Sequence, residues 1–115
     1  MSQVVPFLDA VDRQWKALAQ DMPSSVQTLD VRLSREHQKL CIELSWPGHV
    51  ASITAWENAI CLDVDVVEIE SKKGLIFVAG PCEDRNDARS RLLRFRDYIQ
   101  TSLSPSGGIA SGERT

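Results

Sequence analysis

The chain has 115 residues, of which 43% are hydrophobic and 25% are charged, and its formal net charge is −3 at pH 7. This length fits one domain that can bury a core without metals or disulfides, and the acidic balance argues against general nucleic-acid binding. No apolar run approaches the roughly 18 residues of a membrane span, and the first residues lack the basic and apolar regions of a signal peptide. We therefore expect a cytoplasmic protein.

Apolar residues recur at spacings of three and four in the N-terminal segment, which predicts an amphipathic helix. Pro6 suits the first turn of this helix, and Pro23 ends it. We interpret the apolar stripe as a packing surface. It consists of Val4, Leu8, Val11, Trp15, Leu18 and Met22.

Beyond Ser25 the apolar residues alternate with polar ones, which predicts five short strands separated by turns. The fourth strand shows the clearest alternation, but its phase slips by one residue at Val66 and Val67. A β-bulge at this point would restore the pattern. The expected strands cover residues 29–33, 40–45, 49–56, 62–70 and 75–79.

Asp84 and Asp87 resemble a capping box that starts a second amphipathic helix. Pro105 lies just past its end, and residues 104–115 are rich in Ser and Gly, which predicts a disordered C-terminal tail. Residues 1–103 are then a single α+β domain. The apolar stripe of the second helix consists of Ala88, Leu92, Phe95, Ile99 and Leu103.

The resulting order is α-β-β-β-β-β-α. Short connections favour a five-stranded antiparallel meander, and both helices are available to cover one of its faces. The predicted fold is therefore an α+β two-layer sandwich. The helices are expected to cover the face with Leu40, Ile42, Leu44, Leu62, Val64 and Val66. The other face is expected to carry Cys41, Glu43, Ser52, Thr54, Trp56, Cys61, Asp63, Asp65, Ile76 and Val78.

The charges are unevenly distributed along the chain. Residues 40–70 contain six acidic residues and no lysine or arginine, whereas residues 85–96 contain five arginines and one aspartate. The acidic stretch predicts a sheet face with nothing of its own to neutralise it, which suits a basic protein partner. We interpret the arginines as a solvated helix face whose aliphatic stems lie over apolar surface. Binding of RNA or phosphate is the alternative, and the sequence has no Gly-rich phosphate loop that would favour it.

No pattern of cysteine or histidine residues indicates a metal or cofactor site. Cys41, Cys61 and Cys82 form no CxxC pair and are expected to be reduced thiols. Cys41 and Cys61 would lie on strands two apart, about 9–10 Å from each other, which is too far for a disulfide. His37 and His49 have no ligand at metal-binding spacing.

Asp63 and Asp65 share one face of the fourth strand, about 7 Å apart by the strand rise. Such a pair can serve acid/base chemistry, but carboxylates on an open sheet face are more often solvated. We therefore expect no catalytic residue, and a small enzyme using this pair is an alternative of lower weight.

The segment from Ile53 to Val67 has a distinctive order: an apolar strand that ends in Trp-Glu, a turn of small residues, and a strand alternating apolar with acidic residues. With the amphipathic last helix, it is similar to the TriTu-type immunity proteins encoded beside Rhs polymorphic toxins of type VI secretion systems. The resemblance covers residues 4–103, with Ala59 where the family often has Gly. It implies a cytoplasmic antidote to a cognate toxin, in that family an ADP-ribosyltransferase acting on elongation factor Tu.

We predict that the centre of the toxin-binding surface consists of Glu43, Trp56, Glu57, Asp63 and Asp65. Trp56 would be the aromatic anchor, and the carboxylates would meet lysines or arginines of the toxin. The expected complex is one-to-one, and the free protein is expected to be a monomer that binds neither nucleic acid nor membrane. The alternative is a small acidic secretion chaperone, for which an obligate dimer and an unfolded client segment would be typical.

Overall fold

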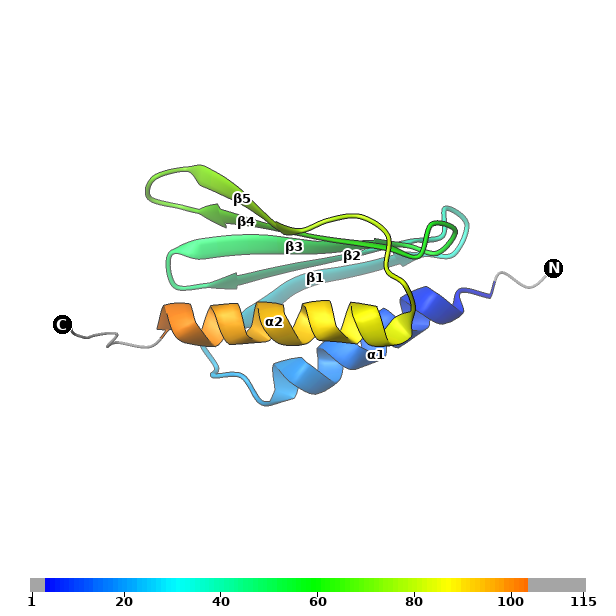
Figure 1. Cartoon of the computed structure of the whole chain (residues 1–115). Coiled ribbons are helices and arrows are strands. Elements are labelled where there is room, and N and C mark those ends of the chain that lie inside the picture. The colour runs from blue at the N-terminus through cyan, green and yellow to red at the C-terminus, as the bar shows by residue number, and fades with distance from the viewer. Residues whose placement is uncertain (1–3, 104–115) are drawn as a thin grey trace.

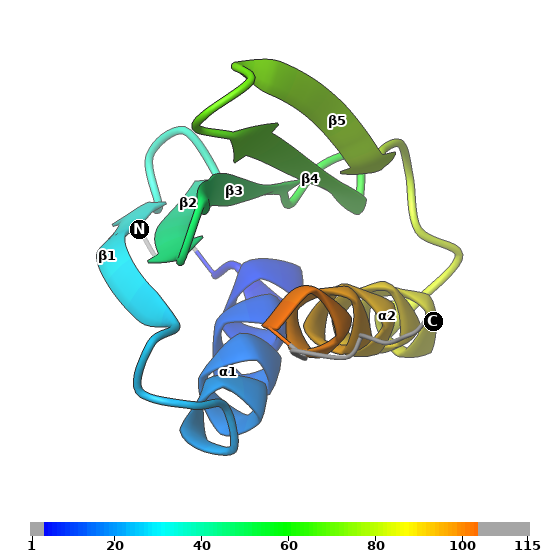
Figure 2. The same cartoon turned by 90° about the vertical axis from the view of Figure 1, so that its left-hand side faces the viewer.

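The computed structural model describes residues 4–103 and shows an α+β two-layer sandwich (Figure 1). Five strands form one antiparallel meander in the order β1-β2-β3-β4-β5, and both helices lie on the same side of the sheet (Figure 2). The predicted fold class is confirmed, whereas the predicted tail at 104–115 lies outside the described residues. The elements are α1 (Pro6–Gln20), β1 (Gln27–Ser34), β2 (Lys39–Trp46), β3 (His49–Trp56), β4 (Cys61–Glu68), β5 (Lys73–Val78) and α2 (Arg85–Leu103).

The predicted stripe of α1 is correct at its centre. Leu8, Val11 and Trp15 are buried, and Pro6 occupies the first turn of the helix. Val4 is 63% exposed, whereas Val5 is buried. Val4 leaves the stripe because it precedes the helix, so the helical spacing does not extend to it.

The core lies between one face of the sheet and the two helices. The sheet side is the predicted face, including Leu40, Ile42 and Leu44 of β2, and the α2 side includes Leu92 and Phe95; all five are fully buried. Burying one such side chain stabilises the fold by about 1.5–3 kcal/mol. Among the described residues, no helix has the length and apolar character needed to cross a membrane.

An aromatic cluster joins α2 to the sheet. Trp46 at the end of β2 meets Phe95 edge-on, with ring centroids 6.0 Å apart, and stacks on His49 at 4.9 Å. Its indole N–H donates a 2.8 Å hydrogen bond to the hydroxyl of Ser102. The last turn of α2 is therefore held to the β2–β3 hairpin. Because both helices lie on this side of the sheet, no described element covers its opposite face (Figure 2).

The predicted bulge at Val66 and Val67 is wrong. The register between β3 and β4 continues without interruption along both strands. The fourth strand ends at Glu68, earlier than the pattern predicted, and Val67 stays on the open face with 39% of its surface exposed.

The irregularity lies in β5 instead. Val64 pairs with Val78, and Asp65 pairs with Ile76, so Phe77 is the extra residue. Phe77 packs against aromatic rings of α2. Because of this bulge, Val78 lies opposite Val64 and packs against the core, so its predicted place on the open face is wrong. Ile76 lies on the open face, 67% exposed.

A second bulge lies in β1. Thr28 pairs with Leu44, and Asp30 pairs with Glu43, so Leu29 is the extra residue. Leu29 is 57% exposed and lines a depression on the open face. The alternating pattern placed Leu29 on the same face as Val31 and Leu33. The bulge turns Leu29 to the opposite face.

Candidate functional site

The open face of the sheet is organised in rows that run across the strands. One row places Glu43 of β2, Ser52 of β3 and Asp65 of β4 side by side. The next rows along the strands contain Cys41, Thr54 and Asp63, and then Lys39, Trp56 and Cys61. Four of the five predicted site residues therefore belong to strand positions on one face, and Glu57 follows the end of β3.

A shallow depression of about 280 Å³ lies on this face. Leu29, Val50 and Val67 supply apolar surface, and Glu43 and Asp65 supply carboxylates. The two carboxylates belong to strands two apart, with backbone separations of about 9–10 Å. We call this feature the carboxylate-rimmed depression.

The expectation of an acidic face with nothing of its own to neutralise it is wrong. Arg32 of β1 lies between two acidic side chains: its Nε is 2.8 Å from Asp30 Oδ2, and its Nη2 is 3.6 Å from Glu43 Oε2. The sequence pattern missed this contact because Arg32 lies outside the acidic stretch. Asp65 is exposed and has no ion-pair partner among residues 4–103, so it is the freer carboxylate of the depression.

Trp56 lies at the other end of β3, half-buried, with the Lys39 ammonium 5.7 Å from its ring centroid. This is within the range of a cation–π contact. Trp56 lies six positions after Val50, which corresponds to about 20 Å along a strand. Trp56 therefore does not line the depression. A ligand that contacted both Trp56 and the depression would have to be about as large as a protein.

Glu57 is engaged by the helix layer. Its carboxylate oxygens accept hydrogen bonds from the backbone N–H groups of Phe7 at 3.2 Å and Leu8 at 3.1 Å. These groups belong to the first turn of α1, where the N-cap residue Val5 provides no capping side chain. Glu57 therefore caps α1 from the β3–β4 turn, and a negative charge is favourable at that helix end.

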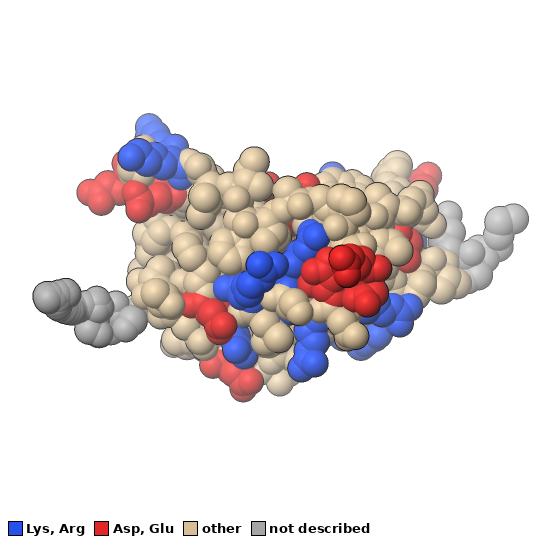
Figure 3. Space-filling model, viewed as in Figure 1, with Lys and Arg blue, Asp and Glu red and all other residues tan. Residues whose placement is uncertain are grey.

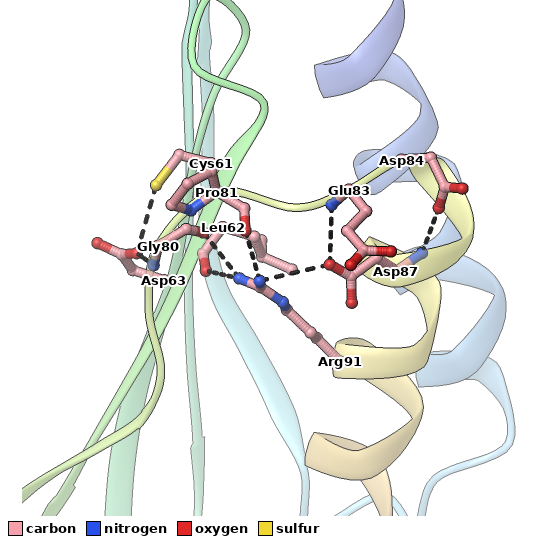
Figure 4. A network of polar contacts seen from close by, with 9 residues as sticks. All are labelled: Cys61, Leu62, Asp63, Gly80, Pro81, Glu83, Asp84, Asp87 and Arg91. Carbon is pink, nitrogen blue, oxygen red and sulfur yellow. Dashed lines mark hydrogen bonds and ion pairs between the residues drawn. The ribbon is translucent and has the colours of Figure 1, made fainter.

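Asp63 is also engaged within the fold (Figure 4). Its Oδ1 accepts a 2.9 Å hydrogen bond from the Gly80 N–H and lies 3.6 Å from the Cys61 thiol, which donates to it. Burial, together with the Asp63 carboxylate, raises the pKa of Cys61. Asp63 thus holds the segment after β5, and the geometry does not favour an acid/base pair with Asp65.

Arg91 has a structural role that the sequence analysis missed. Its Nη1 donates to the carbonyls of Leu62 (3.0 Å) and Gly80 (2.7 Å), and its Nη2 donates to the carbonyl of Pro81 (2.7 Å) and to Asp87 Oδ2 (3.4 Å). Only 12% of the Arg91 side chain is exposed, so its predicted place on a solvated face is wrong. The available signal was Asp87, one turn earlier on the same helix.

The predicted cap at the start of α2 is confirmed, except that the Asp87 side chain binds the N–H of Glu83 and not that of Asp84 (Figure 4). Asp84 Oδ1 accepts a 2.9 Å hydrogen bond from the N–H of Asp87, as a capping box requires. The Asp87 carboxylate reaches back to the N–H of Glu83, also at 2.9 Å. Asp87 therefore links the cap to Arg91.

The outer side of α2 is mixed in charge. In Figure 3, basic side chains lie directly beside a cluster of acidic ones on this side of the molecule. Arg85, Arg89 and Arg94 are exposed, and so are Glu83 and Asp84. The arginine-rich segment therefore does not produce a large field of one sign.

The described residues contain no group of three His, Cys, Asp or Glu side chains placed to hold a metal ion. Cys41, Cys61 and Cys82 are free thiols, and burial raises the pKa of Cys82. Comparison with protein-family models, with curated proteins and with solved structures finds no match to this chain.

Proposed function

We propose that this protein is an immunity protein that binds a cognate antibacterial toxin in the cytoplasm through the open face of its sheet and masks the toxin's active site. The observation that carries this proposal is the carboxylate-rimmed depression, in which apolar surface and acidic groups lie together. The resemblance narrows the toxin to an Rhs-associated ADP-ribosyltransferase effector of a type VI secretion system.

The depression fits a lysine or arginine side chain of the toxin. Its aliphatic stem would lie on Val50 and Val67, as long basic side chains cover apolar surface. Its charged end would meet Asp65, and also Glu43 where Arg32 does not already neutralise it. A toxin that uses a phosphate-bearing cofactor needs basic residues around that cofactor, so binding them would mask the active site.

Trp56 would make the second contact, at the far end of β3. A half-buried indole can insert between partner side chains at small entropic cost, and tryptophan is among the commonest hot-spot residues of interfaces. Its distance from the depression makes the proposed interface at least about 20 Å long, which suits a folded toxin domain.

The test is binding of the purified chain to the toxin domain encoded by the adjacent gene, measured as association and dissociation rates at two salt concentrations. Asp65→Lys should slow association about tenfold at low salt and flatten its salt dependence, because charge steers the encounter. The matched control is Glu83→Lys, which makes the same charge change at an exposed residue before α2. Trp56→Ala should mainly speed dissociation, at a cost of about 2 kcal/mol or more.

Thermal melts of each variant separate a binding defect from unfolding. If Asp65→Lys and Glu83→Lys change association equally, the open face is not the toxin-binding surface. Binding only to an unfolded segment of the partner would instead support a secretion chaperone. A neighbouring gene without a toxin domain would remove the basis for the immunity proposal.

A further inference from the structure

The outer edge of β1 is open. β1 is at one end of the strand order, and no described element lies beyond it (Figure 2). An edge strand presents unpaired N–H and C=O groups to any strand that can lie alongside it. The other edge strand, β5, is shorter and begins with Lys73 directly after Lys72, and a short strand and lysines both discourage pairing at an edge.

The sequence of β1 is self-complementary about Val31. When β1 is placed antiparallel to a copy of itself with Val31 opposite Val31, Asp30 of each copy meets Arg32 of the other. We infer that β1 pairs with β1 of a second copy of this chain around a two-fold axis at Val31. Such an interface uses the same patch on both copies, as closed dimers do.

Charge selects this register. Asp30 and Arg32 are exposed on the open face and contact each other within one chain, with Arg32 Nε 2.8 Å from Asp30 Oδ2. In the dimer each Arg32 lies directly opposite Asp30 of the second copy, a favourable cross-strand pair. Moving the axis to Asp30 or to Arg32 would instead place like charges opposite each other, which is unfavourable.

The groove beside β1 supports the same pairing. It has a volume of about 440 Å³ and is lined by Trp15 and Ala19 of α1 and by Val31 of β1, among other residues. Val31 is 40% exposed, whereas Trp15 is 2% exposed. The indole N–H of Trp15 is buried and has no acceptor among the described residues. A second β1 lying along this edge would cover the apolar wall with its own Val31.

The interface would be small. Because the bulge at Leu29 interrupts the strand, regular pairing about Val31 covers residues 30–32 of each copy, and small interfaces give weak, transient complexes. The dimer is therefore reversible, with a dissociation constant on the order of tens of micromolar. The pairing involves the edge of β1 and uses neither Asp65 nor Trp56, so it does not depend on the proposed function. At concentrations well below this dissociation constant, the chain is a monomer, as the sequence analysis expects. At higher concentrations it is a dimer.

The test is sedimentation velocity of the full chain at concentrations from about 5 to 500 µM, which bracket such a dissociation constant. The wild-type chain should pass from monomer to dimer across this range. Asp30→Arg alone or Arg32→Asp alone should raise the dissociation constant at least about tenfold, because each places like charges opposite each other. An equimolar mixture of these two variants should dimerise, because every cross-strand pair is then of opposite sign.

Arg94→Asp is the matched control, because it makes the same charge change on the exposed side of α2. It should leave the dimer unchanged. A wild-type chain that stays monomeric throughout the range, or a mixture of the two charge variants that fails to associate, would overturn the inference. So would a dimer that survives both single substitutions.

Hydrogen exchange of the unmodified chain gives a readout that does not depend on the folding of variants. Exchange at the amides of residues 30–32 should slow as the concentration rises, because this part of the edge becomes paired. Unchanged exchange along β1 in a sample that sediments as a dimer would place the interface elsewhere and contradict the inference.

Discussion

Glu57 directly follows Trp56 in the sequence, yet the two side chains serve different layers of the molecule. The Glu57 carboxylate accepts hydrogen bonds from the start of α1, while Trp56 lies on the open face beside Lys39. A similar division separates Asp63, which holds the Gly80 backbone, from Asp65, which is exposed. At the scale of single residues, hydrogen-bond partners decide which carboxylates are available to a partner protein.

Replacing Glu57 with Gln should lower the free energy of unfolding by about 1 kcal/mol, because the cap loses its charge at the positive end of α1. Urea unfolding measures this change. Glu36→Gln is the control, since Glu36 is an exposed residue of the β1–β2 turn, and it should change stability by less than about 0.5 kcal/mol. Equal effects of the two substitutions would mean that the cap contributes nothing.

Replacing Asp63 with Asn should make Cys61 more reactive. Burial and the Asp63 carboxylate both raise the pKa of Cys61, so removing the negative charge should lower this pKa. More thiolate is then present at pH 8, and alkylation by iodoacetamide should be faster, since the thiolate is the nucleophile. Peptide-resolved mass spectrometry measures the rate at each cysteine.

Cys41 is the internal control for this experiment, because it lies two strands away from Cys61. If alkylation of both thiols accelerates together, the substitution has loosened the sheet instead of changing one pKa. An unchanged Cys61 rate would contradict the proposed effect of Asp63.

At the scale of elements, the position of α2 depends on polar contacts as well as on its apolar stripe. Arg91 connects the helix to three backbone carbonyls of β4 and of the segment after β5, while the hydroxyl of Ser102 holds the other end of the helix to Trp46. Because β4 and β5 are part of the sheet that forms the open face, these contacts on its covered side help to fix the positions of both strands.

Arg91→Ala should lower the free energy of unfolding by about 2–3 kcal/mol, because charged hydrogen bonds are lost and buried carbonyls are left without donors. The control is Arg89→Ala, since Arg89 is exposed on the same helix, and its effect should be within about 0.5 kcal/mol. Denaturant midpoints of both variants provide the comparison. A loss at Arg91 no greater than at Arg89 would mean that the carbonyls find other donors or water.

At the scale of the whole molecule, one core connects every element. The buried set includes residues of α1, β2, β3, β4 and α2, and Leu33 of β1 and Phe77 and Val78 of β5 pack against it. A single core of this kind predicts cooperative unfolding with no populated intermediate. The open face is therefore a property of the folded domain as a unit.

Leu92→Ala should destabilise this unit by about 2–5 kcal/mol, as truncation of a buried leucine does. Leu92 is fully buried, and the matched control is Leu75→Ala, because Leu75 is 47% exposed on β5. Tryptophan fluorescence and far-UV circular dichroism should give coincident unfolding curves for both variants. Separate transitions would indicate that the helices and the sheet do not share one core, and a small loss at Leu92 would place it outside the core.

The element order, the covered face of the sheet and the cap of α2 could all be predicted from the order of the residues. These features follow from local rules: a period of two or 3.6 residues places apolar side chains on one side of an element, and Asp84 lies three residues before the N–H that it caps. The same rules placed Glu43, Trp56, Asp63 and Asp65 on strand positions of one face.

The positions of the bulges and the pairing of the charged side chains could not be predicted in this way, because they depend on the tertiary fold. The bulge at Phe77 depends on how β5 aligns with β4, the Glu57 cap joins residues about 50 positions apart, and Arg91 binds carbonyls that β4 and β5 bring to it. Each of these contacts depends on where two distant segments meet. Local periodicity carries no information about such long-range contacts, because these contacts are set by how all the elements pack together.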